Sequence, residues 1–248
     1  MRKNGGTAAS RKKAQGRGES FKTIAFAVLI ALFIRTFLVQ AFRIPSGSME
    51  DTLLVGDFLL VDKITYGAKI PGTTLRLPGL RKPRRGDIIV FKDPRTNRDY
   101  IKRAIAVGGE TIQLHQNVVS IDGHVLEEPY KALKPVPGPV RDDFGPYHLS
   151  DDGLFMMGDN RNNSQDSRYW NELDPHRVVG RAFILYWSSD PNRSPRWVRT
   201  LDESPLKGFL SLLLGRPRLD RVGTWLAHDY TTVYAQGNAA AAPAAATP

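Results

Sequence analysis

The longest apolar stretch of the chain lies near its N-terminus, at residues 23–42, and reads TIAFAVLIALFIRTFLVQAF. A helix of about 20 apolar residues spans the roughly 30 Å hydrocarbon core of a bilayer. Arg35 interrupts this run beyond its middle, where a long side chain can extend toward the interface. The pattern therefore predicts one transmembrane helix over residues 23–42.

A basic tail precedes this helix. Residues 1–22 hold seven Lys and Arg residues and one acid, Glu19. Positive charge beside a membrane segment is retained on the cytoplasmic side. We therefore expect residues 1–22 to form a disordered cytoplasmic tail, and everything after residue 42 to face outward.

Two alternatives remain for the apolar run. A cleavable signal peptide would use residues 24–34 as its apolar region and Val39-Gln40-Ala41 as its small-residue cleavage site. A buried helix of a soluble domain is the second alternative, although the run is apolar on nearly every face.

Short β-prone runs follow the apolar run, separated by Gly, Pro and Asp. Asp122-Gly123 between two of them is a two-residue hairpin signal. The fold class is therefore mainly β, a coiled sheet or barrel behind one N-terminal transmembrane helix. The predicted strands cover residues 58–64, 87–92, 99–107, 110–114, 117–121, 124–127, 153–158 and 178–188.

These runs delimit a β domain over residues 43–200. Clusters of Gly, Pro and charged residues predict exposed excursions near residues 66–85 and 128–152. Residues 201–238 form a C-terminal amphipathic segment, whose apolar part at 206–214 is too short to span a membrane. Residues 239–248 form an Ala/Pro tail that we expect to be disordered.

Composition narrows the chemistry. The 248 residues include no cysteine, which excludes disulfides, thiolate nucleophiles and Cys-ligated metals. The net charge is +10, but the basic tail carries much of it, in runs interleaved with Gly and Ala rather than with the aromatic residues that stack on bases. We expect no nucleic-acid partner, no metal and no cofactor.

Two hydroxyls lie on a short constrained segment after the apolar run, in Arg43-Ile-Pro-Ser-Gly-Ser-Met49. Pro45 restricts the backbone around Ile44, and Gly47 permits a turn. Ser46 and Ser48 are thus candidate reactive hydroxyls. The alternative is an ordinary Ser/Gly linker between an anchor and a domain.

Lys102 is the candidate base. Strict alternation along residues 99–107 places it on one strand face with Tyr100, Ala104 and Ala106, and places Arg103 on the other. Burial among small apolar neighbours would lower its pKa and let the neutral amine take a proton from a serine hydroxyl. The alternative is a solvated lysine on a polar strand face.

A third polar stretch, MMGDNRNNSQDSRYW at residues 156–170, is dense in Asp, Asn, Ser and Arg. It lacks the Gly and Glu positions of a calcium loop. We interpret it as a loop held by its own hydrogen bonds beside a site.

Taken in order behind a membrane segment, PSGSM, TLLVGD, RGD, YIKRA and GDNRNNSQDSRYW resemble the bacterial type I signal peptidases, a Ser/Lys-dyad protease family. The resemblance covers residues 42–188. It implies a signal-peptidase-like catalytic domain with Ser48 as nucleophile and Lys102 as general base. The Ser48 backbone N–H and the Ser46 hydroxyl would form the oxyanion hole.

The resemblance also implies supporting roles. Ser164 would bond to the Lys102 amine, Asp166 and Arg168 would pair, and Asp159 would support the site. The substrate would be a preprotein cut after a small-x-small motif such as Ala-x-Ala, bound as an added strand. The residues implied to line its shallow pockets are Phe42, Ile44, Met49, Leu53, Tyr100 and Ile101.

The implied setting is the bacterial inner membrane, with one span and the catalytic domain on the periplasmic or extracytoplasmic side. The lipid bilayer is an implied partner, and the secretion machinery is a further candidate. The chain departs from the family pattern at Gly109-Glu110 and Asn162, neither of which is a proposed catalytic position.

Other classes are weaker. A penicillin-binding protein needs S-x-x-K, which Ser48 does not begin. A self-cleaving Ser/Lys repressor would not be expected to carry a spanning segment before its serine. The non-enzyme alternative is a membrane-anchored β domain that binds exported partners.

Overall fold

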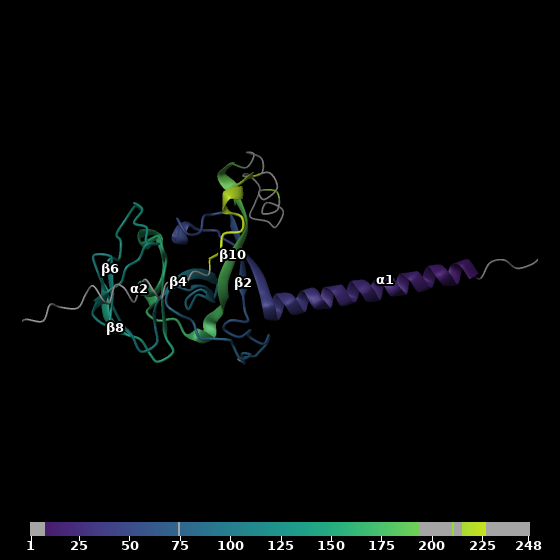
Figure 1. The fold of residues 1–248 in the computed structure, drawn as a ribbon, viewed down its shortest axis with the longest axis horizontal. Helices are drawn as coiled ribbons and strands as arrows, with labels where there is room; N and C mark the ends of the chain where they lie inside the picture. The colour runs from purple at the N-terminus through teal and green to yellow at the C-terminus, as the bar shows by residue number, and fades with distance from the viewer. Residues whose placement is uncertain (1–7, 74, 194–209, 211–214, 227–248) are drawn as a thin grey trace, which may run out of the picture.

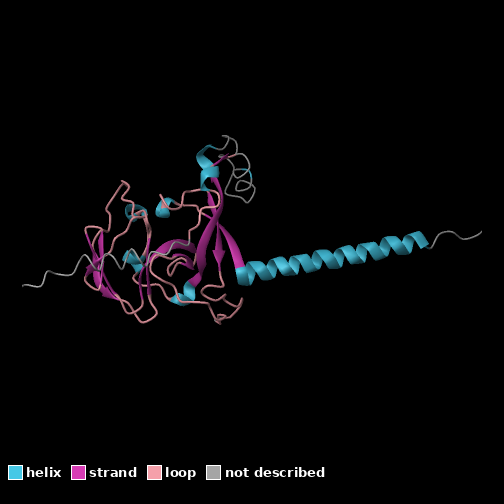
Figure 2. Cartoon of the chain, in the orientation of Figure 1, coloured by secondary structure: helices cyan, strands magenta, loops and turns pink. Residues whose placement is uncertain are grey.

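The computed structural model describes residues 8–73, 75–193, 210 and 215–226. A long N-terminal helix projects from a body made mainly of strands (Figures 1 and 2). The predicted mainly β fold class is confirmed. The predicted apolar segment at 206–214, apart from residue 210, the Ala/Pro tail and most of the segment 201–238 lie outside the described residues.

Helix α1 (Ala8–Phe33) continues into a π-helical turn, Ile34–Leu38. An apolar window within it, Phe21–Leu38, is long enough to cross a bilayer, and none of the window is buried. A soluble core helix would be covered, so the buried-helix alternative is not supported. The helix already starts at Ala8, and the boundary predicted at residue 22 falls inside it.

The helix does not extend to residue 42, so that prediction is wrong. Strand β1 (Val39–Arg43) begins directly after the π-helical turn and pairs along its whole length with β2 (Asp57–Asp62). Sheet pairing thus supplies the backbone partners that would otherwise come from further helix turns. The alternative cleavage site at residues 39–41 lies inside this paired strand.

The large sheet is antiparallel and has the order β1-β2-β10-β3-β4-β9, with β11 paired to β10. Alternation explains β2, in which Leu59 and Val61 are buried and Leu60 between them is half-buried. The remaining strands are β3 (Ile88–Lys92), β4 (Asp99–Val107), β9 (Leu154–Met157), β10 (Val178–Asp190) and β11 (Arg216–Pro217).

Strand β4 has the predicted bounds but not the predicted strict alternation. Its register against β9 shifts between Ala104 and Ala106. Such a bulge places consecutive side chains on the same side. Ile105 and Ala106 accordingly pack in one core cluster, while Ala104 packs in another.

A second sheet has the order β7-β6-β5-β8. Its strand β8 (Phe144–His148) lies inside the segment 128–152 that was predicted as a loop, and this prediction is corrected. β8 occupies the sheet edge, where Pro146 is tolerated because one side needs no ladder bonds. The other strands are β5 (Thr111–His115), β6 (Val118–Ile121) and β7 (His124–Val125).

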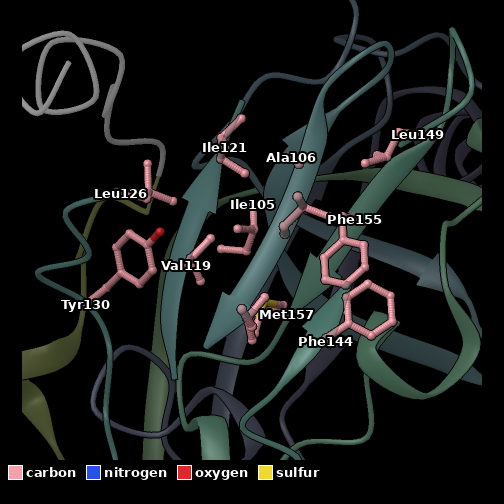
Figure 3. Close-up of a cluster of buried hydrophobic side chains, with 12 residues drawn as sticks. Ile105, Ala106, Val119, Ile121, Leu126, Tyr130, Phe144, Leu149, Phe155 and Met157 are labelled. Atoms are coloured by element: carbon pink, nitrogen blue, oxygen red, sulfur yellow. The ribbon is translucent and has the colours of Figure 1, made fainter. Parts of the chain in front are cut away.

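A buried cluster joins the two sheets. Figure 3 shows Ile105 of β4, Val119 of β6 and Phe155 of β9 converging on one apolar core. A second cluster, which includes Met49 and Leu53, lies under the serine segment. Burial of both clusters fixes β4 between the second sheet and the serine segment, and thereby positions Lys102.

Candidate active site

Ser48 lies in a single 3-10 turn, Gly47–Met49, and its side chain is buried. The loop containing it is closed at its base by two backbone hydrogen bonds. Ile44 N donates to Asp57 O at 2.8 Å, and Gly56 N donates to Ile44 O at 3.0 Å. The segment is therefore a constrained loop rather than a linker.

The polar loop after β9 holds this turn from the other side. Asn160 donates from its backbone N to Ser48 O at 3.2 Å, and from its amide Nδ2 to Gly47 O at 3.1 Å. A Cβ on Gly158 would collide with Ser48 O and with Ser164 Oγ. Only glycine permits this close approach of the two segments.

Lys102 of β4 reaches Ser48 directly. Its Nζ donates a hydrogen bond to Ser48 Oγ at 2.5 Å, and the side chain is 4% exposed. Burial lowers the pKa of Lys102 to about 8, against the nearby carboxylates of Asp166 and Asp159, which raise it. A lysine with this pKa is neutral in a useful fraction of molecules near neutral pH, and can then accept the hydroxyl proton.

Asp159 is bound by Arg103, the residue that follows Lys102 in β4. Arg103 donates from Nε to Asp159 Oδ1 at 2.8 Å and from a terminal nitrogen to Oδ2 at 2.6 Å. Thr52 Oγ1 donates to the same carboxylate at 2.6 Å. This bidentate pair links the serine loop, β4 and the polar loop into one unit.

The predicted pairing of Asp166 with Arg168 is present, with Nε to Oδ1 at 2.9 Å. Asp166 also caps the short helix α2 (Ser167–Trp170) and accepts from Gly158 N at 3.1 Å. The polar loop is thus held by its own hydrogen bonds, as the sequence indicates, and Asp166 fixes the glycine that contacts Ser48.

Two other predicted residues behave differently. Ser164 is buried beside Gly158, but its Oγ forms no hydrogen bond with any described residue, so the predicted bond to Lys102 is absent. The reason is that Lys102 directs its Nζ to Ser48 instead. Ser46 is exposed just before the turn, and its side chain makes no capping hydrogen bond there.

The predicted substrate-lining residues divide into two groups. Phe42, Tyr100 and Ile101 are half-buried and present surface to a ligand. Ile44, Met49 and Leu53 are enclosed in the core, so the prediction that they line an open pocket is not met. They form the floor beneath the serine loop, because closing the loop buries its apolar side chains.

Sequence reasoning missed several residues of the site. Thr52, Arg103 and Asn160 make the contacts that position Ser48 and Asp159. Arg161 and Glu128 form a buried pair next to them. A signal existed for Arg103, because an arginine in the middle of a buried strand requires a carboxylate partner. The described residues contain no group of three His, Asp or Glu side chains suited to hold a metal.

The structure places a serine hydroxyl against a buried lysine, on a β domain behind an exposed apolar helix. The family model described as "Signal peptidase, peptidase S26" matches residues 17–187. The chain belongs to this family. It is a serine peptidase that removes signal peptides, and its N-terminal helix anchors it in the membrane.

Individual relatives agree. Signal peptidase I of Leptolyngbya laminosa is 40% identical, over 73% of this chain and 85% of that protein. The corresponding protein of Pseudomonas aeruginosa is 35% identical, over 71% and 74%. That of Aquifex aeolicus is 33% identical, over 79% and 93%.

Proposed function

We propose that Ser48 and Lys102 form the catalytic dyad of this peptidase, and that it cuts preproteins after small-x-small motifs such as Ala-x-Ala. The observation that carries the proposal is the 2.5 Å contact between Lys102 Nζ and Ser48 Oγ, two buried side chains. Family membership favours this enzyme over a non-catalytic β domain that binds exported partners.

The reaction begins when neutral Lys102 takes the hydroxyl proton as Ser48 Oγ attacks the scissile carbonyl carbon. The Ser48 backbone N–H and the Ser46 hydroxyl stabilise the resulting oxyanion. Protonated Lys102 then gives its proton to the leaving amine, and an acyl-enzyme remains. Water, deprotonated by Lys102, releases the cleaved signal peptide and restores Ser48.

Substrate binding is proposed to use free strand edges. Among the described strands, β1 is the end strand of the large sheet. β9 pairs with β4 only from Arg103 onward, which leaves residues 99–102 open on that side. An extended peptide added at these edges would place its backbone beside both Ser48 and Lys102. Phe42, Tyr100 and Ile101 are half-buried apolar groups available to its side chains.

The proposed setting is the outer face of the bacterial inner membrane, with the N-terminus in the cytoplasm. The basic residues before the apolar window support this orientation. Anchoring enzyme and preprotein in one bilayer raises their effective concentration.

The proposal is tested with the purified full chain in detergent and a peptide that contains one Ala-x-Ala site. We expect cleavage after the second Ala, and loss of at least about 10³-fold in rate for Ser48→Ala and for Lys102→Ala. Ser120→Ala and Lys82→Ala, both remote from the site, serve as matched controls. A near-normal rate for folded Lys102→Ala would refute the dyad while leaving the peptidase assignment intact.

A further inference from the structure

Two cavities lie next to each other where α1 meets the β body. The first has a volume of about 470 Å³ and is almost entirely apolar. Phe33 and Phe37 line it from the helix end, and Ile64 and Leu77 line it from the segment that follows β2. Figure 1 shows this blue segment close to the end of α1. We call this cavity the apolar groove.

The second cavity has a volume of about 420 Å³ and is lined mainly by polar and charged groups. Its cationic residues are Lys63, Lys69, Lys92 and Arg177, against one carboxylate, Asp174. We call this cavity the basic pocket.

The apolar groove and the basic pocket are neighbours along the chain as well as in space. At three places, adjacent residues line one cavity each: Thr36 and Phe37, Lys63 and Ile64, and Lys69 with its neighbours Ala68 and Ile70. A ligand that fills both cavities must therefore be apolar at one end and anionic at the other.

Two cations of the basic pocket have partners within the protein, and the other two can meet an external anion. Lys63 donates to the backbone carbonyls of Arg35 and Thr36, and Lys92 pairs with Asp99 at 2.9 Å. In the described part of the chain, Lys69 and Arg177 form no ion pair. Their charge is therefore free to meet an external anion.

The position of the groove identifies the apolar partner. Phe33 and Phe37 belong to the apolar window Phe21–Leu38, at its C-terminal end, which is the outer end in the orientation proposed above. The groove is thus continuous with the surface that faces lipid. The basic pocket meets the last turn of the span at Thr36 and extends beyond it, toward the depth of the headgroups.

We propose that the apolar groove and the basic pocket together bind one anionic phospholipid of the outer leaflet. An acyl chain would lie in the groove against Phe37 and Leu77, and the phosphate with its anionic headgroup would lie against Lys69 and Arg177. The bound lipid would fill the junction between helix and body, and so hold the domain in a defined orientation on the membrane.

The test uses native mass spectrometry of the detergent-purified full chain with dioleoyl phosphatidylglycerol or dioleoyl phosphatidylcholine. We expect one phosphatidylglycerol to be retained in preference to phosphatidylcholine. Each cation near an anionic surface contributes a factor of about five, so Lys69→Ala/Arg177→Ala should weaken phosphatidylglycerol retention about 25-fold. The matched control, Lys82→Ala/Arg84→Ala, removes the same charge from two residues that line neither the apolar groove nor the basic pocket. It should change phosphatidylglycerol retention less than twofold.

A second pair of substitutions tests the apolar groove. Ile64→Asn/Leu77→Asn, at two partly exposed positions, should reduce retention of both lipids, and circular dichroism checks that the variants are folded. Millimolar inorganic phosphate should not displace the lipid. Equal losses in the control and the Lys69/Arg177 variant, equal retention of the two lipids, or displacement by phosphate would each overturn the proposal. Ser48→Ala should retain the lipid normally, so the result does not depend on the proposed dyad.

Discussion

The buried cations of this protein fall into two regions with opposite solutions to the same problem. Around the polar loop, Arg103, Arg161 and Arg168 are each about 1% exposed. Each pairs with a buried carboxylate, namely Asp159, Glu128 and Asp166 respectively. In the pocket beside Ser48, Lys102 is similarly buried, but no described carboxylate lies within ion-pair distance of its amine.

The difference follows from what each side chain can do with its proton. A guanidinium stays charged at any accessible pH, so burying it without a carboxylate is prohibitive. An ammonium can release its proton instead, and burial lowers the pKa of Lys102 to about 8. The carboxylates of the polar loop are committed to arginines, and this leaves the lysine free to act as a base.

Exchanging the two cation types should give the largest effect. Lys102→Arg keeps a positive charge next to Ser48 but cannot become neutral. We expect peptide cleavage to fall by at least about 10³-fold, measured with the Ala-x-Ala peptide in detergent. Arg103→Lys keeps a charge opposite Asp159 but loses the bidentate contact, so it serves as the comparison and should lose far less activity than Lys102→Arg. Comparable activity in the two variants would show that the proton of residue 102 plays no part.

Breaking one ion pair should give the next largest effect. Arg103→Met leaves Asp159 buried with Thr52 as its remaining side-chain partner, and should lower the free energy of unfolding by about 3–5 kcal/mol. The measurement is denaturant unfolding of the full chain in detergent. The double variant Arg103→Met/Asp159→Leu removes both charges and should recover much of the loss. A single variant as stable as the parent would mean that the pair is not the link between loop and strand.

Removing Lys102 should raise the free energy of unfolding, whereas removing Arg103 lowers it. The folded pKa of Lys102 is about 8 and its ordinary value is 10.5, so between these values the unfolded chain binds more protons and stability rises with pH. Below pH 8 the cost of the buried charge is present in full, and amounts to about 3 kcal/mol. Lys102→Met should therefore be more stable than the parent at pH 7, by an amount that shrinks between pH 8 and 10.5. A stability gap that does not change with pH would contradict a titrating buried amine.

The comparison also explains what sequence could predict. The bounds of β4 and the hairpin at Asp122-Gly123 follow from local alternation and turn chemistry. β1 was missed because the apolar run continues without any marker where the helix gives way to the strand at Val39. β8 was missed because Gly145 and Pro146 conceal a strand at a sheet edge. These are cases in which tertiary pairing decides between local alternatives.

Within the site, local pattern identified the candidate residues but not their partners. Arg103 and Asp159 are 56 positions apart, and nothing near either residue specifies the other. The same holds for Arg221 of the C-terminal segment, which donates to Asp57 at 2.7 Å at the base of the serine loop. The resemblance to signal peptidases supplied the assignment of Ser48 and Lys102. The fold was required to show that Lys102, unlike the buried arginines, has no described carboxylate within ion-pair distance.

The pH dependence of cleavage compares the two regions most directly, and the expected change in rate is the smallest of those considered. Below pH 8 only the neutral fraction of Lys102 can act, so kcat/KM should rise about tenfold per pH unit and level off above 8. The arginines stay charged over this range, so Arg103→Lys should follow the same profile from a slightly lower plateau. The measurement uses an Ala-x-Ala peptide without titratable side chains and with blocked ends. A profile that is flat from pH 6 to 10 would mean that Lys102 does not lose its proton in the reaction, and the contrast between a neutral lysine and charged arginines would then have no catalytic meaning.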